Sequence, residues 1–448
     1  MNLRPLRLLV LLALLALANG CSSSTSPTPT TGEEDDNGPT VAWSVNQFGS
    51  TAGDFVNALA PAAGGGVYAT GLTEAALADA SNLGGYDAYL LRTDETGRIT
   101  WTKQFGTPYN DFGRALAVDA DGNVFLAGDT NGDLDDDTVG YAATKVFVIK
   151  LDADGNQTWH TELGSSDDSV SDQAHAITID PADGFYVAGV TWGNLFGDNQ
   201  GYRDAYVANY RYDETSRTYL LNWYDHYGTL TDEAFYTALT MTDGGVVTAG
   251  YATDNCTYDG GNYLETDVLI VRYSANGVKL WTKRFGADCH DDLALAMAPA
   301  PGGDFYLAGM SAGDIAGGEF QGADDAFVAR FDSDGNLVWI HQLGSGGMET
   351  ARALAADGKG GVYVVGTTDG EMVSGAYGGL EDVFVAHYDP DGNLLWVSQK
   401  GTGDNDEGRA AAAVGDGLVF VGGATRGDLA APGSQVGEYD AFIAVVGP

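Results

Sequence analysis

The sequence predicts an all-β fold, namely a seven-bladed β-propeller with four-stranded blades. Each interval between the recurring tryptophans holds short apolar runs rich in β-branched and aromatic residues, punctuated by Gly, Asp and Asn, which is typical of strands joined by tight turns. The tryptophans recur at spacings of 57 to 64 residues, and a repeat this even leaves no room for a separate domain. The repeats start near Trp43, Trp101, Trp159, Trp223, Trp281, Trp339 and Trp396.

A single repeat shows the expected order of strands. After Trp281 come an Ala-rich run (296–298), a run of the type FYLAG, a variable loop, the run DDAFVAR, and then the next Trp-bearing run at Trp339. We name these strands a, b, c and d, from the Ala-rich strand to the Trp-bearing strand. Only small side chains fit where blades converge on the axis, so strand a is expected to be innermost, with large side chains further out.

The two ends of the folded part complete one blade. The sequence ends on DAFIAVVGP, which has the pattern of a strand c with no strand d after it. The run 43–49 is a Trp-bearing strand with no strands a, b and c before it. We therefore expect a propeller over residues 41–448 in which the N-terminal Trp strand is the outermost strand of the last blade, so that the ring closes without an unpaired edge.

Residues 1–20 have the features of a lipoprotein signal peptide. Arg4 and Arg7 precede an apolar run over 8–18 that is too short to cross a bilayer, and residues 17–21 resemble a lipobox ending at Cys21, although Ala18 stands where Leu is usual. Lipidation of Cys21 is expected; the alternative is ordinary cleavage that leaves a free thiol. Residues 21–40 are rich in Ser, Thr, Pro and acidic residues and are expected to form a disordered tether. The expected location is the outer membrane or cell surface of a bacterium, by a lipid anchor.

The chain is strongly acidic, with 63 Asp and Glu against 21 Lys and Arg and a formal net charge of −42. This charge argues against nucleic acid as a partner. Two explanations remain open at this point: solubility in a salty medium, and carboxylates that hold cations.

Two sets of acids recur at fixed repeat positions. Strand c opens with an acid in six copies, at Asp87, Asp204, Asp267, Asp325, Asp382 and Asp440, with Lys145 as the exception. Both sets are expected on the face that carries the d-to-a and b-to-c connections. They either cap the amides of their own loops or form an acidic channel mouth that collects cations, with calcium as the candidate cofactor. The first set, four residues before the first Ala-type position of strand a, is the candidate metal site: Asp54, Asp111, Asp172, Glu233, Asp292, Glu349 and Asp406.

No motif points to catalysis. Residues 309–313 spell G-x-S-x-G around Ser311, but other copies have Thr73, Thr130, Thr191 and Thr368 at this position, so a repeated turn residue is favoured over a nucleophile. The six histidines are isolated, with no H-x-H or H-E-x-x-H pattern. The D-x-D-G runs lack the ligand spacing of an EF-hand and fit tight hairpins.

Cys256 and Cys289 are the cysteines of the predicted ring. Cys256 falls in the b-to-c loop of one blade and Cys289 in the connection into the next, on the same face, so a disulfide is expected in an exported protein. The alternatives are two unpaired thiols, or a metal site made by Cys289, His290 and Asp291.

The repeat unit resembles the bacterial SBBP-type β-propeller repeat, on residues such as DNDEGRAAAAVGDGLVFVGGAT and EYDAFIAVV, and the resemblance extends over all seven copies. It implies a propeller on an exported protein and implies little about the ligand. The spacing from Asp94 through Gly97 to Trp101 is also similar to the Trp-docking motif of quinoprotein-like propellers, but seven copies depart from the eight usual in that group, and no quinone site is evident.

We therefore expect a non-enzymatic, monomeric envelope lipoprotein that serves as a binding or scaffold module, with a protein, a glycan or a cationic ligand as its partner. One alternative is a lectin-like adhesin that uses aromatic residues of the b-to-c loops. Another is a propeller enzyme with its active site over the channel. The aromatic residues concerned are Tyr202, Tyr258, Tyr263 and Phe320.

Overall fold

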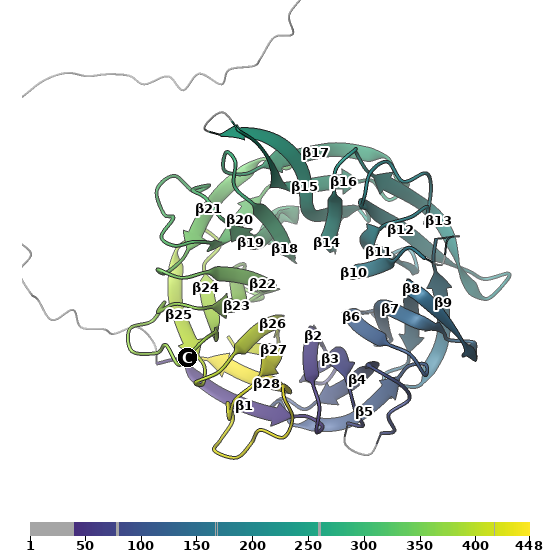
Figure 1. Ribbon diagram of the computed structural model, residues 1–448, viewed down its shortest axis with the longest axis horizontal. Coiled ribbons are helices and arrows are strands. Elements are labelled where there is room, and N and C mark those ends of the chain that lie inside the picture. Colours follow the sequence, from purple (N-terminus) through teal and green to yellow (C-terminus); the bar gives the residue numbers. More distant parts are fainter. Residues whose placement is uncertain (1–39, 78–79, 166, 168, 259–260, 416) are drawn as a thin grey trace, which may run out of the picture. The chain divides into compact units, whose positions relative to one another are not determined.

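The computed structural model describes residues 40–448 except 78–79, 166, 168, 259–260 and 416, so the predicted signal peptide, Cys21 and the predicted tether up to residue 39 lie outside the described residues. In the described part, seven four-stranded antiparallel sheets form a ring (Figure 1). The predicted all-β, seven-bladed propeller is confirmed. The described helical structure is a single 3₁₀ turn at Pro301–Gly303 (η1), and none of the described segments is a helix able to span a membrane.

The strands follow the predicted order a to d from the axis outward (Figure 1). The innermost strands a are β2 (Asp54–Pro61), β6 (Asp111–Val118), β10 (Asp172–Asp180), β14 (Glu233–Thr240), β18 (Asp292–Pro299), β22 (Glu349–Ala356) and β26 (Asp406–Ala413). Strands b are β3 (Val67–Thr73), β7 (Val124–Asp133), β11 (Gly184–Thr191), β15 (Val246–Tyr258), β19 (Phe305–Ser311), β23 (Val362–Thr368) and β27 (Val419–Thr425). Strands c are β4 (Asp87–Thr93), β8 (Asp136–Leu151), β12 (Asp204–Asp213), β16 (Gly261–Tyr273), β20 (Asp325–Phe331), β24 (Asp382–Tyr388) and β28 (Asp440–Gly447). Strands d are β5 (Ile99–Phe105), β9 (Gln157–Leu163), β13 (Thr218–Tyr227), β17 (Lys279–Phe285), β21 (Leu337–Leu343), β25 (Leu394–Lys400) and β1 (Ala42–Phe48).

The ring is closed by the N-terminal strand, as predicted. β1 pairs antiparallel with β28 from Ala42 opposite Gly447 to Phe48 opposite Ala441, and the seventh sheet has the order β1-β28-β27-β26. The indole N–H of Trp43 donates to the hydroxyl of Ser398 in the preceding blade at 2.8 Å. The first strand of the ring therefore holds together the last two blades.

The hydrophobic core is divided among the interfaces between neighbouring blades. One cluster joins Tyr186 and Val207 of the third blade to Phe235 and Leu269 of the fourth, and a corresponding cluster lies between every other adjacent pair. Strand a contributes mainly alanines to these interfaces, such as the fully buried Ala294. The small inner side chains let seven blades converge, as expected from the taper.

The D-x-D-G runs form tight turns, as the sequence analysis favoured. At the c-to-d hairpin of the second blade, a carboxylate oxygen of Asp152 accepts the backbone N–H groups of Asp154 and Asn156. Gly155 in this turn has φ +77°, and a Cβ there would lie 2.7 Å from the ring of Trp101 in the preceding blade. Glycine is required both by the left-handed conformation and by the docked indole.

Two features differ from the expected repeat. The b-to-c connections of the second and fourth blades continue the ladder as hairpins, because β7 pairs with β8 as far as Asp133 and β15 pairs with β16 as far as Tyr258. In addition, each strand a begins at the recurring acid, four residues before the Ala-type position of the pattern. The acids therefore belong to the sheet and to the buried side of the turn that precedes it.

Candidate functional site

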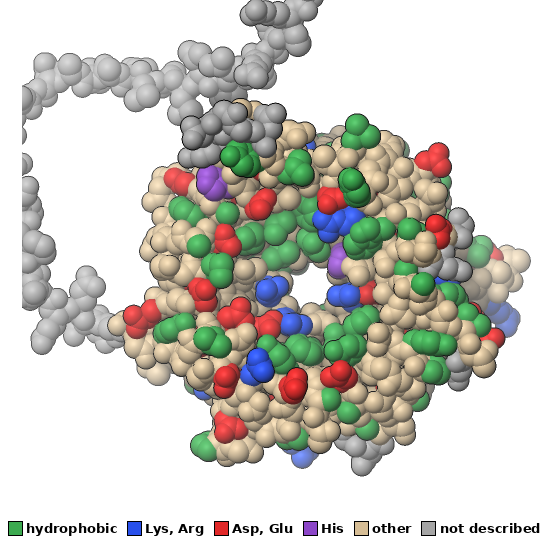
Figure 2. All heavy atoms as spheres, in the orientation of Figure 1, with side chains coloured by type: hydrophobic (Ala, Val, Ile, Leu, Met, Phe, Trp, Pro, Cys, Tyr) green, Lys and Arg blue, Asp and Glu red, His purple; other side chains and the backbone are tan. Residues whose placement is uncertain are grey.

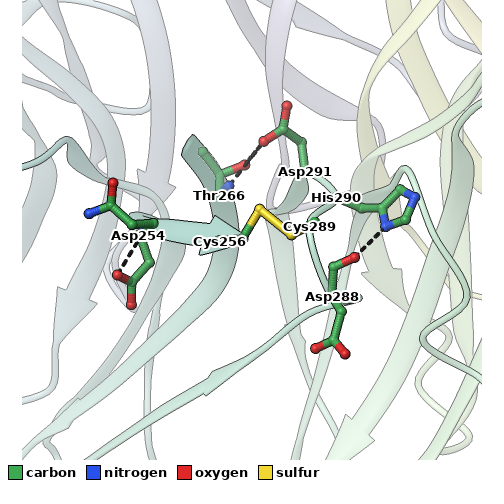
Figure 3. Close-up of a disulfide and its surroundings, with 8 residues drawn as sticks. Asp254, Cys256, Thr266, Asp288, Cys289, His290 and Asp291 are labelled. Carbon is green, nitrogen blue, oxygen red and sulfur yellow. Dashed lines mark hydrogen bonds between the residues drawn. A yellow bond between two sulfur atoms is a disulfide. The ribbon is translucent and has the colours of Figure 1, made fainter. Parts of the chain in front are cut away.

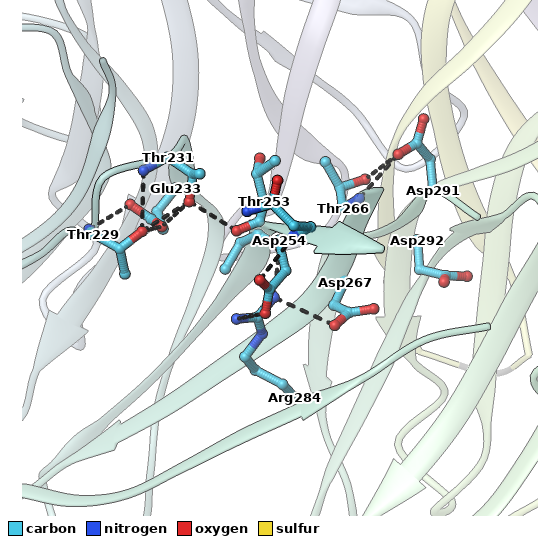
Figure 4. A network of polar contacts seen from close by, with 12 residues as sticks. Thr229, Thr231, Glu233, Thr253, Asp254, Thr266, Asp267, Arg284, Asp291 and Asp292 are labelled. Atoms are coloured by element: carbon cyan, nitrogen blue, oxygen red, sulfur yellow. Dashed lines mark hydrogen bonds and ion pairs between the residues drawn. The ribbon is translucent and has the colours of Figure 1, made fainter. Parts of the chain in front are cut away.

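The seven acids that open strand a are buried, with at most 1% of each side chain exposed. They accept hydrogen bonds from their own d-to-a turns: one carboxylate oxygen of Asp111 accepts the backbone N–H of Thr107 at 2.7 Å and its hydroxyl at 3.0 Å. Figure 4 shows the same arrangement for Glu233 and Thr229. Equivalent bonds are made by Asp54, Asp172, Asp292, Glu349 and Asp406. The candidate metal-site acids thus cap turns, and they do not form an open acidic rim around the channel.

Burial has an electrostatic consequence for these acids. Desolvation raises the pKa of Asp111, and the hydrogen bonds from Thr107 act in the opposite direction. Desolvation likewise raises the pKa of Asp292 to about 6. The fold holds these carboxyl groups where their charge is costly.

The channel itself is lined by a different set of side chains. One residue from the strand a of each blade surrounds a cavity of about 310 Å³, and we call this set the polar ring. Its members are Asn57, Arg114, His175, Tyr236, Leu295, Arg352 and Arg409. Figure 2 shows Lys and Arg side chains gathered around the central opening, with Asp and Glu on the surrounding surface.

Each member of the polar ring is the extra residue of a β-bulge. The pairing of strands a and b skips from Val56 to Ala58 in the first blade, and it skips the equivalent residue in the other six. A bulged residue has no partner in the ladder, and its side chain is re-aimed. The repeated bulge therefore directs one variable side chain per blade toward the axis.

The three arginines of the polar ring have different partners. Arg114 donates to both carboxylate oxygens of Asp129, at 3.0 and 2.8 Å. Arg409 donates to Glu407 at 2.8 Å and to the amide oxygen of Asn57 at 3.1 Å. Within the described residues, no hydrogen bond or ion pair reaches the guanidinium of Arg352.

Arg352 is exposed to the channel but enclosed by the ring of blades, and this desolvation lowers its pKa, while the carboxylate of Glu407 acts in the opposite direction. A guanidinium remains protonated in proteins. In the third blade the imidazole of His175 is neutral, since burial lowers its pKa to about 3, and its ring packs 4.9 Å from that of Tyr236. The polar ring therefore presents one guanidinium without a hydrogen-bonded partner, beside two guanidinium groups that are paired with carboxylates.

Apolar side chains line the next layer of the channel. They stand two residues further along each strand a, on the side away from the d-to-a turns, and comprise Leu59, Leu116, Ile177, Ala238, Met297, Leu354 and Ala411. The channel thus combines a polar ring near one mouth with an apolar ring below it, which fits a ligand that has an anionic head and an apolar body.

The sequence analysis missed the polar ring. The signal lies at the fourth residue of strand a, where a large or charged residue can interrupt a run of small ones, as at Arg352 between Ala351 and Ala353. Because its residue type changes from copy to copy, a search for shared acids passes over this position.

The other sequence candidates are separate from the channel cavity. Ser311 is buried and its hydroxyl donates to the carbonyl of Gly313, as expected for a turn residue. Tyr202 and Tyr263 are exposed by 79% and 56%, Phe320 is half-buried, and Tyr258 ends β15. The aromatic residues of the adhesin alternative therefore include two exposed tyrosines on different blades.

Cys256 and Cys289 are joined in a disulfide with their Cα atoms 5.5 Å apart (Figure 3). The alternative ligands His290 and Asp291 point away from the sulfur atoms: His290 contacts the carbonyl of Asp288, and Asp291 accepts from Thr266. The acidic side chain that lies beside the sulfur atoms is that of Glu265, and His290 and Asp291 do not belong to this group. The bridge ties the β15–β16 hairpin to the turn that enters the fifth blade.

We expect the Cys256→Ser/Cys289→Ser variant to lose about 2–4 kcal/mol of unfolding free energy, because the bridge closes a long loop in the unfolded chain. Urea unfolding of both proteins measures the difference. Labelling of the denatured, unreduced parent with a thiol reagent is the companion test, and two reactive thiols besides Cys21 would contradict the bridge.

The fold and its lined channel place the chain among the β-propellers. The SBBP β-propeller repeat matches residues 100–135, 158–197 and 338–371. The chain therefore carries SBBP β-propeller repeats, and its described residues form seven blades.

Relatives with known names are distant. The regulatory protein FlaEY of Caulobacter vibrioides is 30% identical over 161 residues, which cover 32% of this chain and 17% of the length of FlaEY. Among solved structures, Sqt1 of Saccharomyces cerevisiae is similar at a TM-score of 0.46 and 11% identity over 90% of this chain and 98% of Sqt1. The PQQ-bound aldose sugar dehydrogenase of Streptomyces coelicolor has a TM-score of 0.37 and 13% identity over 75% of this chain and 94% of the enzyme.

Proposed function

We propose that the protein is a non-enzymatic binding module of a bacterial envelope, anchored by lipid at Cys21, and that its channel takes a small organic anion with an apolar part. The observation that carries the proposal is Arg352, an unpaired guanidinium in the polar ring. In a chain of net charge −42, three arginines line this one cavity, and two of them are paired with carboxylates. The Cys256–Cys289 bridge supports an oxidising compartment and hence export.

The geometry suggests how such a ligand is held. A planar guanidinium binds a carboxylate through two parallel hydrogen bonds. Arg114 and Arg409 are already occupied by Asp129 and Glu407, so they serve mainly to position the ring, and Arg352 is free to pair with the ligand. The apolar layer of Leu59, Leu116 and the residues around them is suited to the ligand's hydrocarbon part.

Binding without turnover is the simplest role for this set of side chains. The polar ring contains no Ser, Thr or Cys, and its histidine is held neutral against Tyr236. A nucleophile paired with a base is what covalent catalysis requires. We therefore include no chemical step in the proposal.

Hexanoate is a suitable probe, with hexylammonium as the probe of opposite charge. We expect calorimetry to detect hexanoate binding and no binding of hexylammonium. Arg352→Gln should weaken hexanoate binding about 10- to 100-fold, because hydrogen bonds to charged groups contribute about 1.5–3 kcal/mol.

Arg98→Gln is the matched control, since it removes the same charge from an exposed side chain outside the polar ring. Its affinity for hexanoate should equal that of the parent. Equal affinities of the parent and Arg352→Gln, or binding of hexylammonium as tight as that of hexanoate, would contradict the proposed site.

A further inference from the structure

The acids that open strands c and a meet in pairs between neighbouring blades, at the glycine that ends strand d. The position of a Cβ on Gly106 lies 2.8 Å from oxygens of both Asp87 and Asp111. At Gly49 the corresponding distances to oxygens of Asp440 and Asp54 are 2.8 and 2.9 Å. At Gly286 they are 2.4 and 2.5 Å, to oxygens of Asp267 and Asp292. We call the place between strand c of one blade and strand a of the next, beside this glycine, a junction; at one junction Lys145 stands in place of the strand c acid.

Carboxylate oxygens at the junctions are buried without partners. The Oδ1 atoms of Asp87 and Asp111 accept no hydrogen bond, and both side chains are at most 1% exposed. The unpaired Oδ1 of Asp87 is the atom that lies 2.8 Å from the position of a Cβ on Gly106, so it points into the junction. The same atom is buried and unpartnered in Asp54, Asp204, Asp292, Asp325 and Asp382. Both carboxylate oxygens accept hydrogen bonds in Glu349, Asp406 and Asp440. A buried acceptor without a donor costs free energy, and a second carboxylate beside it adds repulsion.

Three of the junctions contain a basic side chain. Lys145 stands in place of the strand c acid and interacts electrostatically with Asp172. The methylene groups of its side chain lie beside Gly164. His226 lies 3.6 Å from Asp204. Arg284 lies 3.3 Å from Asp267, as Figure 4 shows.

The other four junctions have a neutral glutamine at the place of His226 and Arg284, two residues before the glycine that ends strand d. They hold two carboxyl groups and no base. Their residues are Asp440, Gln47 and Asp54; Asp87, Gln104 and Asp111; Asp325, Gln342 and Glu349; and Asp382, Gln399 and Asp406.

We propose that each of these four junctions binds one calcium ion. The two carboxylates match the charge of a divalent cation. Calcium accepts carboxylate oxygens in irregular geometry more readily than magnesium does. The proposal is independent of the channel ligand, because no junction carboxylate belongs to the polar ring.

The swap at the Lys145 junction supports this assignment. There the glutamine position is Glu162, and the strand c position carries the ammonium group, so the chain supplies its own cation beside Asp172. At this junction, the ammonium group of Lys145 therefore stands where the proposed ion would bind at the other four.

The test is calcium binding by chelator-treated protein, measured by calorimetry at pH 7.5 in 150 mM NaCl, with the melting temperature followed in parallel. We expect four ions per chain and a rise in melting temperature that NaCl at matched ionic strength does not reproduce. Asp87→Asn/Asp111→Asn, which keeps the turn-capping acceptors, should lower the number of ions to three. If this double variant unfolds, the single variant Asp87→Asn serves instead.

Asp172→Asn is the matched control, because it changes the same strand a position at the junction that has Lys145, and four ions should remain. Lys145→Asp/Glu162→Gln converts that junction to the pattern of the others, and the number of ions should rise to five. The proposal is overturned if the parent binds no calcium, if Asp172→Asn loses an ion as Asp87→Asn does, or if the converted junction gains none.

Discussion

A propeller that starts at residue 51, and so lacks residues 41–50, should melt far below one that starts at residue 40 and should aggregate on warming. The deletion removes β1, which leaves β28 as an unpaired edge and exposes the core that Trp43, Val45 and Phe48 cover. Burial of these three large side chains contributes on the order of 5 kcal/mol. That value is comparable with the whole stability of an ordinary domain, about 5–15 kcal/mol.

Calorimetric melting of the two proteins measures the effect, with light scattering to follow aggregation. A synthetic peptide of residues 41–50 provides the control: added in excess, it should restore part of the lost melting temperature by pairing with β28. Identical melting of the proteins that start at residues 40 and 51 would show that β1 does not close the ring in solution.

Cys21→Ser should move essentially all of the protein from the membrane fraction to the soluble fraction. The proposal makes lipid on Cys21 the anchor, and two or more acyl chains bind a bilayer firmly, whereas the strongly acidic propeller is repelled by anionic headgroups. Fractionation of cells that express the parent and the variant measures the change. Ser22 follows the cysteine, and we expect the parent in the outer membrane where the cell has one.

The double variant Cys256→Ser/Cys289→Ser controls for the general loss of a thiol and should stay with the membranes. Retention of Cys21→Ser in the membrane fraction would exclude lipid as the anchor.

The sequence was sufficient for the architecture because the signals of a propeller are local and repeated. Trp101 of a strand d contacts Gly155 in a turn of the next blade, and Trp223, Trp281 and Trp339 make the same contact, so the repeated copies predict repeated blades. The strand around Trp43 has no strands a, b and c before it, and the last strand c has no strand d after it. Pairing these two strands is the arrangement that leaves the ring without an unpaired edge, and β1 does pair with β28. The turn-capping role of acids such as Asp111 was also among the predicted alternatives.

The polar ring and the junctions were decided by the closed ring. Arg114, Arg352 and Arg409 belong to three blades and differ in type from their counterparts, so only the bulge in each strand a and the closure of the circle bring them around one cavity. Likewise Asp87 and Asp111 were recognised as members of two separate sets, whereas the contact between blades makes them a pair. By itself, the sequence determined what each blade repeats, because strand and turn formation depend on neighbouring residues. The tertiary structure decided which variable side chains face the axis and which charges meet, because these contacts depend on register and on the packing of one blade against the next.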